Sequence, residues 1–141
     1  MATVDVRSST REFLQTCVNR DEVDRLADFV AADVLVHAGT TCDMPEVRGL
    51  PELADVLRRI HRVFPDLHLT LEDMVAEGNR VAVRWTARGT HEREWAGVPA
   101  TGRRVTFGGM DLYRYEGGRI REWWRNEDFA HLMDQLSAPD A

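Results

Sequence analysis

Hydrophobic residues recur at helical spacing in the first half of the chain and alternate with polar residues in most of the second half. Ser9 and Glu12 have the spacing of a capping box, which predicts the start of a first helix. A second short helix is expected over residues 23–30. A third is expected over residues 51–64, where the initial proline suits a first helical turn. A closing helix is expected over residues 128–136.

The alternating segments predict a sheet. An apolar run at residues 34–37 indicates a short strand, and a long polar loop follows it. Residues 67–77 and 80–92 alternate around Gly78–Asn79, a dipeptide typical of tight hairpins. Helices followed by a long antiparallel or mixed sheet predict the α+β class, with the curved sheet wrapped around the N-terminal helices. Such a cone leaves a pocket for a small apolar ligand at its open end.

The last hairpin, within residues 103–128, can form in two registers. A two-residue loop would set Arg114 opposite Arg121, an unfavourable pair of like charges. A three-residue loop with a bulge at Gly118 would instead set Asp111 opposite Trp123. We expect the three-residue loop. It places one acid, one guanidinium and several apolar groups on a single surface: Val105, Phe107, Asp111, Tyr113, Trp123 and Arg125.

Composition bounds the class of protein. The 141 residues suit one domain with a substantial core, and 43% hydrophobic with 30% charged residues is ordinary for a globular protein. A net charge of -6 without a basic run argues against nucleic-acid binding. No apolar run is long enough to span a membrane, and the N-terminal residues lack a signal-peptide pattern. Cys17 and Cys42 predict neither a disulfide nor a metal site, which fits a cytoplasmic location.

Three residues are candidates for catalysis. Asp111 would lie among aromatic side chains, where loss of water raises the pKa of a carboxyl group and suits it to proton transfer. Arg125, on the same surface, would stabilise a developing oxyanion. His37 ends an apolar strand beside the polar loop and would orient the substrate or assist. The alternative is that Asp111 and Arg125 form an ion pair with no part in catalysis.

Further residues are candidates for contact with a substrate. They are aromatic or polar groups near the expected pocket: Trp85, His91, Trp95, Phe107, Tyr113, Trp123 and Asp128. Some have a structural alternative. Asp128 begins the closing helix, where aspartate is a favoured N-cap, and His91 ends a strand, where a hydrogen-bonded core histidine is common. Neither histidine has the acidic neighbours of a metal site.

Several segments also resemble a known family. They are VLVHAG, FPDLHLTLEDMVAEGNRVAVRWTARGTH, GVPATGRR, DLYR and GGRIREWW, in this order. Together they are similar to SnoaL-like polyketide cyclases over residues 10–136. That family belongs to the cone-shaped α+β barrels, a group that includes ketosteroid isomerase and scytalone dehydratase. The resemblance implies a single domain over residues 1–141 with an internal pocket.

The resemblance also implies an activity. SnoaL-like cyclases use acid–base chemistry, without metal or organic cofactor, to close an aldol ring in polyketide antibiotic biosynthesis. This implies a lyase or isomerase type of enzyme acting on a polyketide-like or aromatic polycyclic molecule. In the alignment, Arg125 stands where the cyclases carry their acid, and Asp128 matches an acid of the wider family three residues later.

Two other functions remain open from the sequence. An epoxide hydrolase or hydratase could use an Asp–Arg pair to position water, and a non-catalytic module could bind a small hydrophobic molecule in the same pocket. We also expect a homo-oligomer, a dimer or a tetramer. Trp124 falls on the opposite face of the sheet from Trp123, where a subunit contact could bury it.

Overall fold

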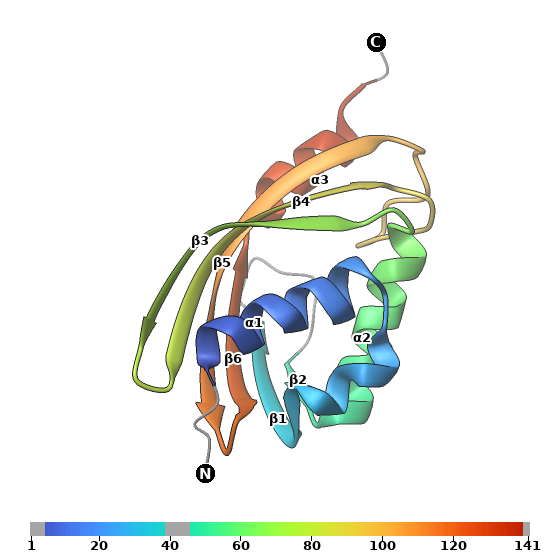
Figure 1. Ribbon diagram of the computed structural model, residues 1–141. Coiled ribbons are helices and arrows are strands. Elements are labelled where there is room, and N and C mark those ends of the chain that lie inside the picture. Colours follow the sequence, from blue (N-terminus) through green and yellow to red (C-terminus); the bar gives the residue numbers. More distant parts are fainter. Residues whose placement is uncertain (1–4, 39–45, 140–141) are drawn as a thin grey trace.

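The computed structural model describes residues 5–38 and 46–139, and it has one curved sheet with helices packed in its hollow (Figure 1). In chain order the elements are α1 (Val6–Phe13), the π-helix η1 (Leu14–Asn19), the 3-10 helix η2 (Val23–Asp28), β1 (Val30–Ala38), β2 (Val47–Arg48), α2 (Leu50–Val63), β3 (His68–Glu77), β4 (Arg80–Thr90), β5 (Arg104–Glu116), β6 (Arg119–Glu127) and α3 (Phe129–Ser137). The expected α+β class is confirmed. The long polar loop contains β2, and its residues 39–45, with Cys42, lie outside the described residues.

The sheet has the strand order β2-β1-β6-β5-β4-β3. Neighbouring strands are antiparallel except β1 and β6, which are parallel, so the sheet is mixed. The three long strands β3, β4 and β5 bend around α1, while α2 closes the other side of the hollow (Figure 1). The sheet is therefore an open, curved wall whose inner face meets the helices.

The first helix begins earlier than the sequence predicts. Asp5 is its N-cap, and the Asp5 carboxylate accepts hydrogen bonds from the backbone N–H groups of Arg7 (3.0 Å) and Ser8 (3.5 Å). Ser9 lies inside the helix, so the prediction of a capping box at Ser9 was wrong. The apolar positions do not distinguish a helix capped by Asp5 from one capped by Ser9, because both helices place the same residues on the same face.

The second helical segment is shorter than predicted. It ends at Asp28, and Val30 already belongs to β1. Val30 pairs with Ile120 of β6, and the Ile120 N–H donates to the carbonyl of Phe29 at 2.9 Å. Pairing with a strand ninety residues away therefore decides the structure here, against a local spacing that suits a helix.

The β5–β6 hairpin has neither of the two uniform registers. Glu116 pairs with Arg119 across a two-residue loop, but the register then shifts, so that Arg121 is an extra residue in β6. Beyond this bulge Asp111 lies directly opposite Arg125. The expected three-residue loop was wrong. The expected set of residues sharing one face is correct, because the bulge restores the same alternation.

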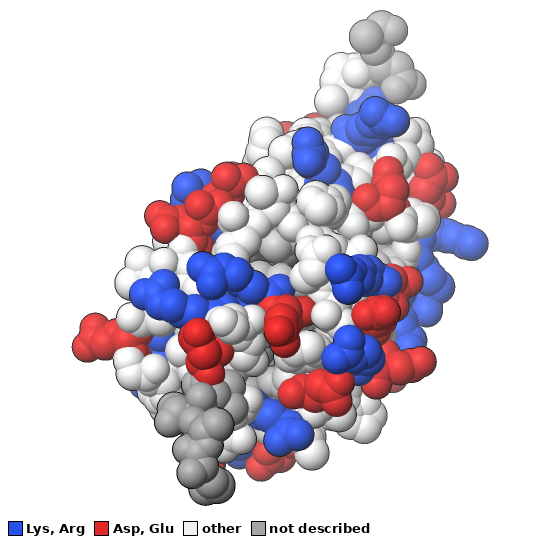
Figure 2. Space-filling model, viewed as in Figure 1, with Lys and Arg blue, Asp and Glu red and all other residues white. Residues whose placement is uncertain are grey.

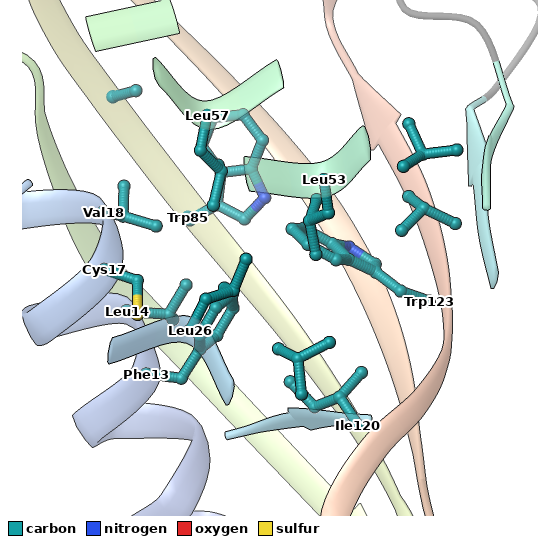
Figure 3. Packing of buried hydrophobic residues seen from close by; sticks show 14 of the residues in the cluster. Phe13, Leu14, Cys17, Val18, Leu26, Leu53, Leu57, Trp85, Ile120 and Trp123 are labelled. Atoms are coloured by element: carbon teal, nitrogen blue, oxygen red, sulfur yellow. The ribbon is translucent and has the colours of Figure 1, made fainter. Parts of the chain in front are cut away.

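The core fills the space between the helices and the inner face of the sheet (Figure 3). Phe13 of α1 is fully buried, and its ring meets Trp123 edge to face, with ring centres 5.7 Å apart at 89°. Tyr113 meets the same ring of Phe13 at 6.1 Å and 83°. Such edge-to-face pairs add to the free energy gained by burial. They fix α1 against the strands that carry Asp111 and Arg125.

Two side-chain amides form hydrogen bonds with backbone groups at open edges of the sheet. Asn19, at the end of η1, accepts from the N–H of Leu69 (2.7 Å) and donates to the carbonyl of Leu69 (2.9 Å) on the edge strand β3. Gln135 of α3 does the same for Thr106 at 2.9 and 2.8 Å. Thr106 lies on β5 beyond the last residue paired with β6, so within the described part of the chain its backbone has no strand neighbour on that side.

Candidate active site

A cavity of about 60 Å³ lies between the inner face of the sheet and the helices. Its lining is mostly apolar and comes from η1, α2, the sheet and α3: Leu14, Val18, Leu57, Ile60, His61, Phe64, Leu67, Leu69, Trp85, Ala87, Trp95, Phe107, Asp111, Tyr113, Trp123, Arg125, Glu127 and Leu132. A concave apolar wall with a few converging polar groups is the usual form of a small-molecule site.

Asp111 is the more buried of the two carboxyl groups in the cavity wall, with 4% of its surface exposed against 8% for Glu127. Its Oδ2 accepts a hydrogen bond from Nε1 of Trp123 at 3.0 Å and a longer one from the hydroxyl of Tyr113 at 3.4 Å. Its Oδ1 has no hydrogen-bond partner among the described residues. One carboxyl oxygen is therefore fixed by aromatic donors, and the other is buried in the cavity wall.

Burial controls the protonation of this carboxyl group. Loss of water raises the pKa of Asp111, and this effect outweighs the opposing influence of Arg125, the indoles of Trp85 and Trp123, and the backbone of Asn126. Burial also raises the pKa of Tyr113 well above its ordinary value, so the phenol stays protonated as a donor. A carboxyl group with a raised pKa can take up and release a proton closer to neutral pH.

Arg125 lies inside the cavity wall and not at a solvated strand end. Its side chain is 11% exposed, and Nη2 is 3.7 Å from Oε2 of Glu127, whose side chain is 5% exposed. The guanidinium carbon also lies 5.5 Å from the ring centre of Trp123, a cation–π distance. A guanidinium keeps its proton at any pH of interest, so Arg125 supplies a fixed positive charge to the site.

Two polar residues of the lining were not foreseen from the sequence. Glu127 shares the inward alternation of Trp123 and Arg125, so continuing the strand pattern by two residues would have found it. His61 lies on α2, four residues after Leu57, and its two ring nitrogens each lie 2.7 Å from a backbone carbonyl, of Leu57 and Val18. Only the packing of α2 against η1 reveals the second of these contacts.

Five of the seven predicted substrate contacts line the cavity: Trp85, Trp95, Phe107, Tyr113 and Trp123. The other two do not. His91 is fully buried beside the cavity, where its Nδ1 lies 2.9 Å from the hydroxyl of Thr101. Asp128 is exposed and caps α3, since its carboxylate accepts from the N–H of His131 at 3.1 Å. These are the structural alternatives that the sequence left open.

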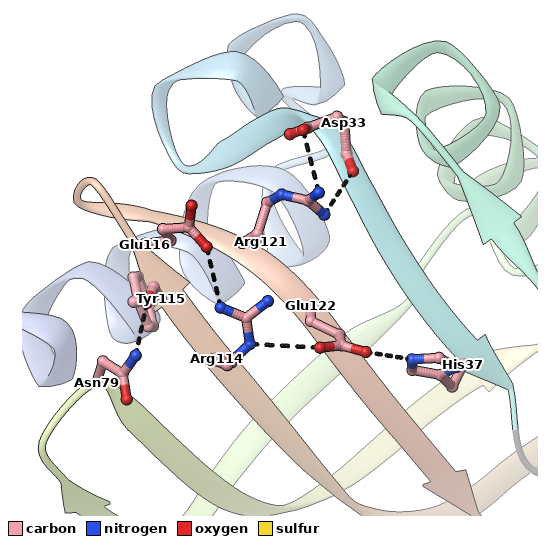
Figure 4. A network of polar contacts seen from close by, with 8 residues as sticks. All are labelled: Asp33, His37, Asn79, Arg114, Tyr115, Glu116, Arg121 and Glu122. Carbon is pink, nitrogen blue, oxygen red and sulfur yellow. Dashed lines mark hydrogen bonds and ion pairs between the residues drawn. The ribbon is translucent and has the colours of Figure 1, made fainter.

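His37 does not lie with Asp111, and its interpretation as an orienting group is not retained. Strand β1 turns Val36 inward and His37 outward, where Nε2 of His37 is 2.6 Å from Oε2 of Glu122 (Figure 4). The His37 ring stacks on Trp124 at 5.3 Å, and Glu122 also binds Nε of Arg114 at 3.3 Å. His37 therefore belongs to a polar network on the outer face of the sheet.

Among residues 5–38 and 46–139 no group of three or more His, Cys, Asp or Glu side chains is arranged to hold a metal ion. No helix in these ranges has the length and apolar character needed to cross a membrane. Charged side chains of both signs are interspersed on the face shown in Figure 2, which shows no broad basic patch.

Comparison with known proteins gives a consistent set of relatives. The model of the family described as SnoaL-like polyketide cyclase matches residues 8–136. The aklanonic acid methyl ester cyclase DnrD of Streptomyces peucetius is 28% identical over 122 residues, which cover 86% of this chain and 83% of that protein. DauD of Streptomyces sp. (strain C5), a cyclase of the same description, is also 28% identical, over 86% of this chain and 75% of that protein.

Solved structures show the same similarity at the level of the fold. Wild-type IdmH from Streptomyces antibioticus, described as a putative polyketide cyclase, has a TM-score of 0.80 and 30% identity, covering 95% of this chain and 99% of that one. TsrD from Streptomyces laurentii has a TM-score of 0.84 and 28% identity, covering 97% of this chain and all of that one (100%).

Proposed function

Because the chain belongs to the SnoaL-like polyketide cyclase family, we propose that it is an enzyme that rearranges an aromatic, polyketide-like small molecule by acid–base catalysis without a cofactor. The reaction is an aldol-type ring closure or an isomerisation. The observation that carries the proposal is Asp111: a buried carboxyl group with a raised pKa, held by two aromatic donors in a mostly apolar cavity wall. The names of DnrD and DauD support an aromatic polyketide ester as the class of substrate.

In ring closure, Asp111 acts first as a base and then as an acid. Its carboxylate removes a proton from the carbon beside a carbonyl group, and the C–H electrons form an enolate. The enolate carbon attacks a second carbonyl carbon of the same molecule, which makes the new C–C bond and leaves an alkoxide. Asp111 returns its proton to the alkoxide, so the product is an isomer of the substrate. Arg125 stabilises the negative oxygen at each stage.

The small volume of the cavity constrains how a substrate binds. Its volume of about 60 Å³ holds only a few water molecules, because one water needs roughly 10–15 Å³ of such space. Sites that bury a drug-sized molecule measure roughly 300–1,000 Å³. Binding of a polycyclic substrate therefore requires the walls to part.

Isotope labelling tests the reaction type. The purified protein is incubated with aklanonic acid methyl ester, the compound in the names of both relatives, in D₂O and separately in H₂¹⁸O. We expect an isomeric ring-closed product with no solvent oxygen in the new hydroxyl and no carbon-bound deuterium beyond that exchanged without the protein, because this ring closure forms no new C–H bond. Incorporation of ¹⁸O at that hydroxyl would show a hydrolase or hydratase. Saturable binding without any product, across a panel of polyketide esters, would show a binding module.

We further propose that a second copy of the chain covers the outer face of the sheet. Val75, Ala82, Leu112 and Trp124 lie side by side across four strands and form a transverse apolar row. Met110, beside this row, is 59% exposed, and Val75 is 64% exposed. Both positive and negative side chains flank the row, as in Glu77–Arg80 and Arg114–Glu122, so two identical faces can offer each other opposite charges.

Light scattering during gel filtration tests this contact. Met110→Glu places a charge where the apolar faces would meet, and we expect the dissociation constant of the oligomer to rise at least about tenfold, because burying an unpaired charge is costly. Ala130→Glu, at an exposed position on α3, is the matched control and should leave the mass unchanged. A wild-type protein that is monomeric at all concentrations would refute the proposed contact.

A further inference from the structure

Two buried carboxylates and one guanidinium share the cavity wall. Asp111 lies directly opposite Arg125 in the β5–β6 ladder, and Glu127 follows Arg125 on the same face of β6. Arg125 forms an ion pair with Glu127, in which Nη2 and Oε2 are 3.7 Å apart. The donors that reach Oδ2 of Asp111, an indole and a phenol, are both uncharged. The guanidinium therefore forms an ion pair with Glu127 and also acts electrostatically on Asp111, whose pKa it lowers against the effect of burial.

We propose that Glu127 is a positioning residue: by pairing with Arg125 it holds the guanidinium beside Trp123 and leaves Asp111 able to exchange a proton. The catalytic consequence rests on the proposed function, whereas the arrangement of charges does not. Glu127 itself is not required to touch the substrate. Glu127 acts on Arg125, and the position of Arg125 in turn affects the protonation of Asp111.

A count of charges shows why the second acid matters. With both carboxylates ionised, the three groups carry a net charge of −1 although all three side chains are largely buried. A developing oxyanion would raise this to −2, which is unfavourable where the effective dielectric constant is low. One acid must therefore hold a proton when the oxyanion forms. Asp111 is the deeper of the two acids and its pKa is raised by burial, so the proton is assigned to Asp111.

The surroundings of Asp111 contain few other charges. The ionisable groups that line the same cavity are Tyr113 on β5, Arg125 and Glu127 on β6, and His61 on α2. The lining residues from η1, β3, β4 and α3 are uncharged. His61 is held by the carbonyls of Val18 and Leu57. A change confined to Glu127 therefore alters the charge around Asp111 without replacing any of its own hydrogen-bond donors.

The test is a direct titration of Asp111 in the full chain. Protein labelled with ¹³C-aspartate is titrated by NMR, and the carboxyl signal of Asp111 is assigned by its absence in Asp111→Asn. In Glu127→Gln one negative charge near Asp111 is lost, and the charge of Arg125 is no longer opposed by the Glu127 carboxylate. We therefore expect the titration midpoint of Asp111 to fall by about 1 pH unit or more, since an opposite charge within reach stabilises a carboxylate.

Glu122→Gln is the matched control. It is the same substitution on the same strand, but the Glu122 side chain lies on the outer face with His37 and Arg114 (Figure 4). It should leave the Asp111 midpoint unchanged. A midpoint of Asp111 that stays the same or rises in Glu127→Gln would overturn the proposal. If that variant does not fold, Glu127→Asp is used: its carboxylate stands farther from Arg125, so the midpoint must fall by a smaller amount, and no fall overturns the proposal.

Turnover separates this inference from the proposed function. In Glu127→Gln the pH profile of kcat should move to lower pH by the same amount as the NMR midpoint, a change that a purely structural role of Glu127 would not produce. An NMR shift in a protein that turns over no substrate would leave the charge arrangement standing and the function refuted. Turnover with a pH profile unmoved by the variant would refute the role of Glu127 alone.

Discussion

Replacing Asp111 with asparagine is expected to lower turnover by about 10²–10⁴-fold, the usual contribution of a positioned general acid or base. Asparagine keeps the shape of the side chain and can still accept from the indole of Trp123, but it cannot exchange a proton at neutral pH. Initial rates with an aromatic polyketide ester measure the effect. Asp73→Asn, on an exposed position of β3, should retain full activity. A fully active Asp111→Asn protein would remove the proposed mechanism.

The same variant should also change how stability depends on pH. The folded-state pKa of Asp111 is raised by burial, so between its unfolded and folded pKa values the native state binds more protons than the unfolded chain. The free energy of unfolding of the wild-type protein therefore falls as pH rises through that window. Asp111→Asn lacks this loss. We expect its stability relative to wild type to increase from pH 3.5 toward neutral, as measured by urea unfolding.

The second large effect is expected at Gly109, which lies beneath the indole of Trp85. A Cβ atom at this position would overlap Cζ2 of Trp85 and lie 2.7 Å from the carbonyl oxygen of Asn126. Gly109→Ala must therefore push the indole into the cavity or part β5 from β6. We expect a loss of about 1–3 kcal/mol in the free energy of unfolding, typical of overpacking, together with a shifted tryptophan emission.

The neighbouring glycine provides the comparison for this variant. At Gly108 an added Cβ would meet only the carbonyl oxygen of Trp85, at 3.2 Å, so a small adjustment suffices. Gly108→Ala should cost less stability than Gly109→Ala and leave the emission spectrum near that of wild type. Equal effects of both substitutions would show that strand conformation, and not the packing of Trp85, decides the outcome.

The inner face of the final hairpin could be predicted from alternation, but its register could not. Each interpretation assumed that the loop alone sets the pairing, whereas the bulge at Arg121 shifts it by one residue. The Arg121 guanidinium binds the carbonyl (2.8 Å) and the carboxylate (3.1 Å) of Asp33 on β1 (Figure 4). That contact joins residues far apart in the chain. No local pattern contains it, and it is consistent with an outward turn of the strand at this point.

The site was predicted in part for the same reason. Asp111 and Arg125 follow from period-two alternation, which is a property of each strand by itself. His37 was assigned to the site because it lies beside a loop. The alternation of inward and outward residues along its strand was not considered, although it places His37 on the outer face. His61 comes from a helix whose inner face holds apolar residues on either side, so its polar contact with η1 appears only when the helix is docked.

The amides of Asn19 and Gln135 have a consequence for crowded solutions. Each occupies the position that the peptide group of an incoming chain would take, on β3 and on the overhanging part of β5. An intruding polypeptide must first displace a bidentate amide before it can extend the sheet there. Natural proteins commonly protect open sheet borders from such growth into aggregates. Here two polar side chains from helices perform that protection, one on each flank of the β3–β4–β5 unit.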